Sequence, residues 1–212
     1  MSRATRGSSA PEEGPLVSSF TLRSARLEDA PDVLGIYAPY VRDTTISFEY
    51  APPDLAAFGA RMAGIMETHP YLVCEHGSQI LAYAYASRHM ERPAYAWDVQ
   101  TSVYASPQSR GQGFGRALYV ALFTLLRALG YYNAYAVITL PGQGSVEFHR
   151  SMGFTDAGVH HRSGYKFGAW HDVAWMEKPL LETGDPVAPP RRMNELDPAW
   201  VKGCLQAFSR AD

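Results

Sequence analysis

The sequence predicts a mixed α/β fold, in which a mostly antiparallel sheet of about six to seven strands is flanked by helices. The chain has 212 residues, of which 46% are hydrophobic and 12% aromatic, and this is enough apolar material for one buried core. The spacing of the apolar residues changes along the chain in the order β-α-α-β-β-β-α-β-α-β-β. Because this order has one crossover helix between two long strands, it indicates a mixed sheet rather than a fully parallel one.

The N-terminal half begins with a strand and two helices. Residues 20–23 alternate between apolar and polar side chains, as a strand does. The first helix has apolar residues at the spacing i, i+3, i+4, i+7, and these are Val33, Ile36, Tyr37 and Tyr40. We expect Asp29 to cap this helix and Pro31 to lie in its first turn. A second helix is expected after Pro53, with an apolar face made of Leu55, Phe58, Met62 and Ile65.

Strands and one long helix dominate the rest of the predicted domain. Strands at residues 71–75 and 80–87 flank a hairpin turn, and a longer strand covers residues 95–105. The most amphipathic helix ends at Gly130, and its apolar face consists of Leu118, Ala121, Leu122, Leu125, Leu126 and Leu129. The last predicted elements are a strand at 134–140, a short helix at 145–152, and two closing strands at 154–159 and 171–179.

We divide the chain into three parts. Residues 1–18 are rich in Ser, Gly, Pro and charge and are expected to form a flexible arm, whereas residues 19–181 form the folded domain. Residues 182–212 comprise a Pro-rich linker and a terminal amphipathic helix that begins at Asp197 and Pro198. The apolar stripe of that helix consists of Val201, Cys204, Leu205 and Phe208.

Charge and cysteine content exclude several classes of protein. The net charge of −2 provides no basic surface for nucleic acid or for an anionic membrane. The two cysteines, Cys74 and Cys204, form neither a disulfide framework nor a zinc-binding spacing, which fits a reducing cytoplasm. The N-terminus lacks the apolar core of a signal peptide, and no apolar run approaches the roughly 20 residues that span a bilayer. We therefore expect a soluble, cytoplasmic protein.

Residues 107–117 form a glycine-rich loop between a predicted strand and the most amphipathic helix. Gly111, Gly113 and Gly115 lack a Cβ atom, so consecutive backbone N–H groups can turn towards one anion. The helix start adds the positive end of its dipole, and Arg110 and Arg116 add two full charges. The loop matches neither the Gly-Lys-Ser/Thr of a P-loop nor the G-x-G-x-x-G of dinucleotide sites. It suits a pyrophosphate, and a glycine-rich turn without a ligand is the alternative.

The loop resembles the R/Q-x-x-G-x-G/A signature of the GNAT acetyltransferase superfamily, as Arg110-x-x-Gly113-x-Gly115. The resemblance extends over roughly residues 20–180 and is sharpest to the phosphinothricin acetyltransferase branch. The segments that carry it are Tyr95-x-Trp97, Ser102-Val103-Tyr104, Ala117-Leu118-Tyr119, Ile138-x-Leu140-Pro141, Ser145-Val146-x-x-His149, Gly153-Phe154 and Gly164-Tyr165-Lys166-x-Gly168-x-Trp170-His171-Asp172-Val173.

This resemblance implies that acetyl-CoA binds where two parallel strands, residues 95–105 and 134–140, splay apart. The family transfers the acetyl group by direct attack of a neutral amine on the thioester, without an acyl-enzyme. The residues expected to contact acetyl-CoA are Val103, Tyr104, Ala105, Arg110, Gly111, Gln112, Gly113, Phe114, Gly115, Arg116, Gly142 and Ser145. At position 142 the family usually has an Asn that touches CoA, so Gly142 is expected to lose one hydrogen bond worth about 1 kcal/mol.

The resemblance leaves the general base open. Where the family usually has Glu or Asp, this chain has Gln100, which cannot usefully accept a proton. Asp98 lies on the same face of the strand two residues away, and Glu49 lies in the loop that family members use to cover substrate. His149 matches a family His near the departing thiolate, and its reference pKa of about 6.5 suits proton transfer. The candidate catalytic residues are therefore His149, Gln100 and Asp98, with Glu49 as a further candidate base.

The resemblance also implies substrate contacts from Phe48, Glu49, Arg92, Tyr95, Lys166 and His171. The guanidinium of Arg92 suits bidentate bonds to a carboxylate or phosphinate. His171 and its neighbour Asp172 can instead fix the final strand by local hydrogen bonds. The histidines show no HExxH or Cys/His spacing, so no metal ion is expected.

Three functions fit the sequence. The first is N-acetylation of the primary amine of a small amino-acid-like substrate, of the phosphinothricin or methionine sulfoximine type. The second keeps the fold and the cofactor but acts on a protein N-terminus or another amine. The third is a CoA-binding domain that is not an enzyme, because its base position has become Gln100. Members of the family are commonly dimers, so we also expect a homodimer.

Overall fold

A computed structural model describes residues 19–182, 184 and 188–210. Within these residues the chain forms a seven-stranded sheet in the order β1-β2-β3-β4-β5-β7-β6. Neighbouring strands are antiparallel, except that β4 and β5 are parallel. The strands are β1 (Thr21–Ser24), β2 (Tyr71–His76), β3 (Gln79–Arg88), β4 (Asp98–Ala105), β5 (Asn133–Thr139), β6 (Thr155–Lys166) and β7 (Ala169–Pro179). The predicted mixed, mostly antiparallel sheet is confirmed.

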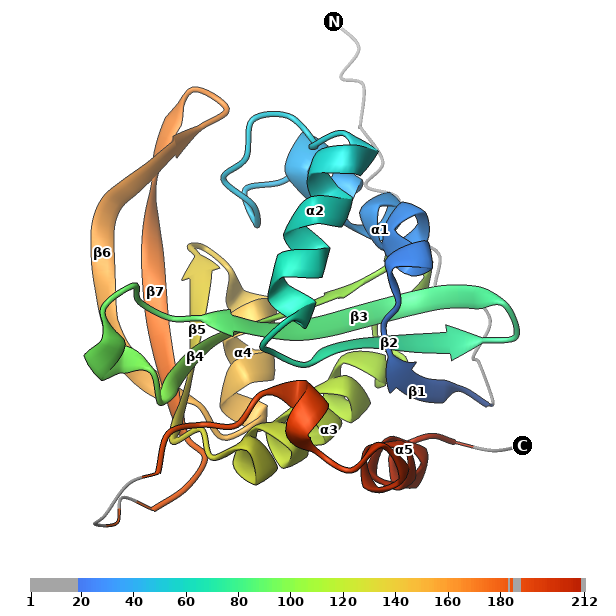
Figure 1. The fold of residues 1–212 in the computed structure, drawn as a ribbon. Helices are drawn as coiled ribbons and strands as arrows, with labels where there is room; N and C mark the ends of the chain where they lie inside the picture. Colours follow the sequence, from blue (N-terminus) through green and yellow to red (C-terminus); the bar gives the residue numbers. More distant parts are fainter. Residues whose placement is uncertain (1–18, 183, 185–187, 211–212) are drawn as a thin grey trace, which may run out of the picture.

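Helices cover both faces of this sheet (Figure 1). On one face, α1 (Ala30–Asp43) and α2 (Leu55–Met66) pack around buried side chains such as Val33, Phe58 and Tyr83. On the other face, α3 (Phe114–Leu129) and α4 (Gln143–Ser151) contribute to the main core. A fifth helix, α5 (Pro198–Ala207), packs against β1 and α3. The site described below lies between these two layers of helices.

The amphipathic sequence of α3 places this helix at the centre of the main core. Leu118, Leu122 and Leu125 recur on one helical face and have no exposed surface. The helix ends as predicted at Gly130, whose φ of 92° lies in the left-handed region that favours glycine. Burial of this stripe fixes α3 across the strands and so fixes the position of the loop at its start.

Asp29 does not cap α1 as the sequence suggested. Its backbone is already helical, with φ −78° and ψ −11°, and its side chain makes no cap bond. Its carboxylate instead accepts two hydrogen bonds from the Arg23 guanidinium, at 2.7 and 2.8 Å, and one from the Arg26 amide at 2.7 Å. The Asp29 carboxylate therefore binds the Arg23 guanidinium instead of capping α1, because a charge-assisted bidentate pair is stronger than a neutral cap bond.

Two predicted strand boundaries were also wrong. β4 begins at Asp98 rather than at residue 95, because Pro93 starts a short 3₁₀ turn (Pro93–Tyr95) and proline lacks the N–H that a paired strand needs. β6 continues to Lys166 rather than ending at residue 159. Two bulges shift its register against β7 and interrupt the alternation of side chains, although the pairing continues.

The C-terminal segment packs against the rest of the chain. Asp197 caps α5 as predicted, accepting a hydrogen bond from the Ala199 amide at 3.1 Å. Val201 and Leu205 of the predicted apolar stripe are buried in the main core. Beyond α5, a pair of antiparallel backbone bonds of 2.8 and 2.9 Å joins Arg210 to Phe20. The predicted arm, residues 1–18, lies outside the described residues. None of the helices described is long and apolar enough to cross a membrane.

Candidate active site

β4 and β5 form a fork in the sheet. Their parallel pairing covers only residues 98–100 with residues 133–135. Just beyond these pairs, the Thr101 hydroxyl donates to the Tyr135 carbonyl at 3.2 Å, and the ladder between the two strands ends. The predicted pair of splayed parallel strands is therefore confirmed.

The β4 edge inside the fork carries backbone donors. The Ser106 amide, just after the strand, bonds the Leu81 carbonyl of β3 at 2.8 Å. Because the N–H groups of a strand alternate in direction, the amides of Val103 and Ala105 face the opposite side, towards β5. The Ala105 carbonyl already accepts a hydrogen bond from the Tyr40 hydroxyl at 2.6 Å. An extended ligand with carbonyl and amide groups can thus lie along this edge as an added strand.

The glycine-rich loop lies directly beyond this edge, at the start of α3. Gly113 is the N-cap with φ 88°, and Gly111 has φ 76°, so both need the freedom of glycine. The first bond of the helix runs from the Ala117 amide to the Gly113 carbonyl at 3.1 Å. The amides of residues 114–116 therefore have no acceptor within the helix. This arrangement of free amides and a helix dipole fits a diphosphate group.

Two exposed guanidinium groups flank the loop. The Arg110 guanidinium lies 5.0 Å from the centre of the Tyr40 ring, and Arg116 Nη1 lies 3.8 Å from the Met152 sulfur. In the part of the chain that the structure describes, neither forms an ion pair with a carboxylate. The loop is also held internally, because Gln112 donates to the Gln108 carbonyl at 3.2 Å. The positive charge at the helix start is thus available to an anion.

Gly142, the N-cap residue before α4, lies in a position that has no room for a side chain. A Cβ atom there would lie 2.5 Å from the Thr139 carbonyl oxygen and 2.7 Å from Ile138 Cγ2. The Asn that the resemblance leads one to expect at this position therefore does not fit this backbone. Contacts from α4 to a cofactor must come from neighbouring groups, and the Ser145 carbonyl is already bonded by His149.

His149 is a buried histidine with both ring nitrogens engaged. It is 5% exposed, Nδ1 lies 2.7 Å from the Ser145 carbonyl, and Nε2 lies 3.1 Å from the Tyr119 hydroxyl. Desolvation lowers the pKa of His149, so the ring is neutral, donating from Nδ1 and accepting at Nε2. These contacts join α4 to α3 and leave no ring nitrogen directed at the fork. The catalytic role of His149 stays a prediction that this geometry does not support.

Gln100 and Asp98 lie on the same face of β4, as alternation requires. Gln100 pairs in register with Tyr135 of β5 and Ser87 of β3, at the last rung before the fork opens. Asp98 lies two residues earlier on β4, farther from the open part of the fork. Its Oδ1 accepts a hydrogen bond from the Asn133 side chain at 2.9 Å. The amide of Gln100 is therefore the nearer of the two to the open part of the fork.

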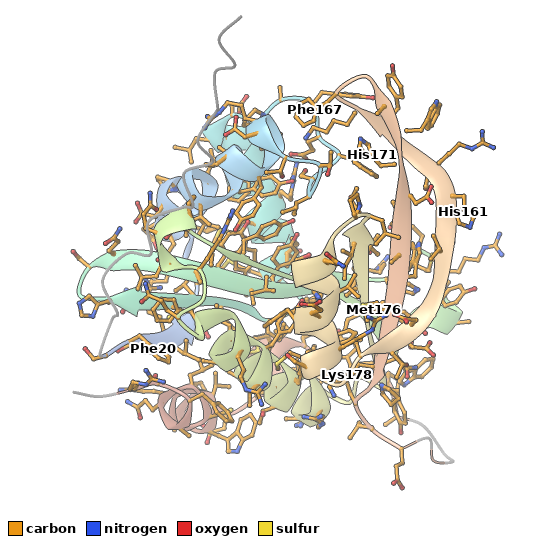
Figure 2. All side chains as sticks on the ribbon, turned by 180° about the vertical axis from the view of Figure 1, so that it is seen from behind. Phe20, His161, Phe167, His171, Met176 and Lys178 are labelled. Carbon is orange, nitrogen blue, oxygen red and sulfur yellow. The ribbon has the colours of Figure 1, made fainter. Side chains whose placement is uncertain are left out.

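The loop of residues 44–50, which follows α1, carries Phe48 and Glu49. Glu49 Oε1 accepts a 2.6 Å hydrogen bond from Arg61 of α2. Its second carboxylate oxygen, Oε2, is buried and has no hydrogen-bond partner among the described residues. Phe48 is 36% exposed, and its ring centre lies 6.3 Å from that of His171 on β7. Figure 2 shows His171 near the end of β7 where the hairpin with β6 turns, and Phe167 at the tip.

Lys166 is not free to contact a substrate. It is 1% exposed, and Nζ donates to the carbonyls of Val41 at 2.6 Å, Thr44 at 2.8 Å and Ser47 at 2.7 Å. An ammonium group has three donors, so all are used. The expectation of a direct substrate contact was therefore wrong, and the charge of Lys166 instead holds the backbone that leads into the 44–50 loop.

The remaining predicted substrate contacts are less closely gathered. Arg92 and Tyr95 are exposed and lie in the segment between β3 and β4. His171 Nε2 lies 3.0 Å from the Lys166 carbonyl. Asp172 accepts hydrogen bonds from the Arg162 amide at 2.7 Å and pairs with His161 at 2.9 Å, and these contacts lower its pKa. Asp172 therefore fixes the last strand locally, which was the alternative considered for it.

Two side chains that lie beside predicted site residues were missed from the sequence. Arg61 holds Glu49, and its signal was available, because it is the only charged residue in the twelve-residue sequence of α2. Tyr85 pairs in register with Ser102 on the Gln100 face of β4. It belongs to a stack of tyrosine rings whose other members are Tyr71, Tyr83 and Tyr104, and of the four Tyr71 and Tyr83 are buried. No local sequence signal separates these rings from ordinary core residues.

Comparison with known proteins agrees with this geometry. The model of the acetyltransferase (GNAT) domain matches residues 22–175. The chain therefore belongs to the GNAT acetyltransferase family. It is 38% identical over 171 residues to a phosphinothricin N-acetyltransferase of Alcaligenes faecalis, covering 80% of this chain and 86% of the relative.

Other similar proteins point to the same branch of the family. An L-methionine sulfoximine/L-methionine sulfone acetyltransferase of Pseudomonas paraeruginosa is 32% identical over 167 residues, covering 78% of this chain and 97% of the relative. The crystal structure of a phosphinothricin acetyltransferase from Sinorhizobium meliloti, in complex with acetyl-CoA, superposes with a TM-score of 0.75 at 34% identity. That match covers 81% of this chain and 96% of the other.

Proposed function

We propose that this protein transfers an acetyl group from acetyl-CoA to the primary amine of a small amino-acid-like substrate. The observation that carries this proposal is the fork, in which an open β4 edge leads directly to the free amides at the start of α3. The relatives named above act on phosphinothricin or methionine sulfoximine, which are small amino acids with a second acidic or polar end. The fork and the diphosphate loop favour acetyl-CoA as the donor, and the relatives favour small amines over other acceptors.

The protein's part in the reaction is mainly orientation. Acetyl-CoA supplies a thioester, which a neutral amine attacks directly. The amides of Val103 and Ala105 that face the fork hold the pantetheine arm of acetyl-CoA as an added strand and polarise the acetyl carbonyl. Arg110 and Arg116 neutralise charge at the diphosphate loop. Positioning of the two reactants accounts for most of the expected rate gain.

We assign the amine's proton to Glu49 rather than to Gln100, Asp98 or His149. Gln100 has no basic group, Asp98 bonds Asn133, and His149 has both nitrogens engaged. Within the part of the chain that the structure describes, Glu49 has a buried carboxylate oxygen without a hydrogen-bond partner, and burying such an oxygen is costly unless a donor meets it. A substrate ammonium group is such a donor, and it becomes nucleophilic when Glu49 takes its proton. Gln100 then orients the amine by hydrogen bonding.

The experiment that tests this function is a turnover screen over free amino acids with acetyl-CoA, following release of free CoA thiol. We expect turnover with at least one amino acid and an increase in melting temperature with acetyl-CoA. Arg110→Ala and Arg116→Ala should each weaken acetyl-CoA binding about fivefold, as exposed charge pairs do, whereas exposed Lys202→Ala should not. A thermal shift without turnover on any amine would instead favour a CoA-binding domain, and no thermal shift would exclude both functions.

Two finer features are also proposed. A homodimer is supported by apolar surface at the β6–β7 hairpin, where Tyr165, Phe167 and Trp170 are 47%, 62% and 61% exposed. Light scattering of the purified protein tests it, and a monomer at all concentrations would exclude it. A cytoplasmic location is supported by Cys74 and Cys204, which are both free thiols.

A further inference from the structure

We propose that Lys166 is a positioning residue that ties the 44–50 loop to the β6–β7 hairpin, and that this tie restricts the enzyme to small free amines. The inference rests on the proposed N-acetyltransferase function and specifies its substrate class. We call the 44–50 loop a bridge, because it is attached on both sides of the open fork. Lys166 attaches this bridge to the β6–β7 hairpin.

The ammonium group of Lys166 acts as the centre around which the loop is wrapped. Its three hydrogen bonds go to the carbonyls of Val41, in the last turn of α1, and of Thr44 and Ser47. All three acceptors lie more than 115 residues away in sequence, so the contact joins two distant parts of the chain. Burying an ammonium group is favourable only when its donors are satisfied, and here the loop backbone satisfies all three.

Three further contacts hold the same loop, each from a different element. They are the Tyr37–Ser47 hydroxyl pair at 2.8 Å from α1, the Arg61–Glu49 bond at 2.6 Å from α2, and the Tyr50 hydroxyl on the Tyr165 carbonyl of β6 at 2.9 Å. The loop is therefore attached at both sides of the fork. α1 and α2 lie over the β2–β4 side, and the β6–β7 hairpin lies beside β5 (Figure 1).

Phe48 packs the bridge against the β6–β7 hairpin. Its ring lies directly on the backbone of Gly164, so close that a Cβ atom added there would overlap three ring carbons. His171 lies on the same hairpin beside it, with 6.3 Å between ring centres. Phe48 is still 36% exposed, so it keeps surface that can contact a ligand. Phe48 and Glu49 are thus fixed before any substrate binds.

A bridge held from both sides limits what can approach the fork. A free amino acid needs space for one side chain and one carboxylate. A peptide continues beyond that carboxyl group, and its second residue would have to displace the loop. The contacts of Lys166 and Tyr50 therefore select against the amino terminus of a peptide, and loosening them should relax this selection.

The test compares one amino acid that the enzyme acetylates with a tripeptide that begins with the same residue. Lys166→Met keeps the length of the side chain and removes its donors, and Tyr50→Phe removes one bond from an exposed position. The matched control is Lys202→Met, an exposed lysine on α5. We measure KM and kcat for both amines, KM for acetyl-CoA, and the melting temperature.

We expect wild type to prefer the free amino acid. In Lys166→Met, KM for the amino acid should rise about tenfold while KM for acetyl-CoA stays unchanged, and the preference over the tripeptide should shrink. Tyr50→Phe should shift the preference in the same direction by a smaller factor, and it alone decides if Lys166→Met does not fold. A wild type that acetylates both amines equally, or variants that keep the wild-type preference, would overturn the inference. Absence of turnover on every free amine would refute the proposed function instead.

Discussion

The substitution Glu49→Gln separates the proposed role of Glu49 as proton acceptor from its structural role as the partner of Arg61. The substitution keeps the size of the side chain and an oxygen that can accept the 2.6 Å bond from Arg61, but it removes the basic group. The Arg61 and Glu49 side chains are 43% and 32% exposed, so screening limits the loss of folding stability to about 1 kcal/mol. Loss of a general base should lower kcat/KM about a hundredfold, which corresponds to about 2.7 kcal/mol. The catalytic effect therefore exceeds the structural one.

Thiol release at saturating acetyl-CoA, measured from about pH 6 to 9, checks this prediction. In Glu49→Gln the rate should rise more steeply with pH, because the variant reacts only with amine that has already lost its proton in solution. The double variant Glu49→Gln/Gln100→Glu should recover part of the rate, since it returns a carboxylate to β4. An unchanged kcat/KM across the pH range, with only a lower melting temperature, would refute the assignment and leave Glu49 as an anchor for Arg61.

Two further predictions concern stability. Desolvation, with the Arg88 charge adding to it, lowers the pKa of His69 to about 4, against about 6.5 when unfolded. Between these pH values only the unfolded chain binds a proton at His69. The free energy of unfolding therefore falls as pH drops below about 6.5, by at most about 2 kcal/mol at pH 5. His69→Phe should remove this loss in urea unfolding at two pH values, and an equal loss in the variant would contradict the prediction. Gly113→Ala meets no steric contact but needs φ near 88°, so it should cost about 1 kcal/mol and about 2–4 °C in melting temperature. Gly59→Ala, inside α2 with equal space around it, should be neutral or stabilising, and similar losses in both variants would rule out the backbone explanation.

The features that the sequence predicted correctly have local causes. The stripe of α3, its stop at Gly130 and the glycines before it depend on spacing within about twenty residues, and local spacing is visible in a sequence. The fork was reached through resemblance rather than spacing, because nothing local records where a ladder between two strands ends.

The features that the sequence predicted wrongly depend on partners from other secondary-structure elements. Lys166 is a charged residue in a polar stretch, and its carbonyl acceptors lie at least 119 positions away. Asp29 has the residue type of a helix cap, but Arg23 on the neighbouring strand takes its carboxylate. In both cases contacts with another element decide which groups the side chain meets. The catalytic role of His149 stays a prediction, and its ring nitrogens are engaged by the Tyr119 hydroxyl of α3 and the Ser145 carbonyl of its own helix.

The fork also divides the sheet into two halves. β1 to β4 form one half and β5, β7 and β6 the other, and only three residue pairs of strand ladder join them. A ligand that lies along β4 and reaches β5 supplies the missing rungs, so binding adds to the cohesion of the sheet itself. The amides of Val103 and Ala105 should then exchange their hydrogens with water more slowly in the presence of acetyl-CoA. In this fold acetyl-CoA would serve as an eighth strand. Without acetyl-CoA, the short ladder between β4 and β5 would be the part of the sheet that opens first.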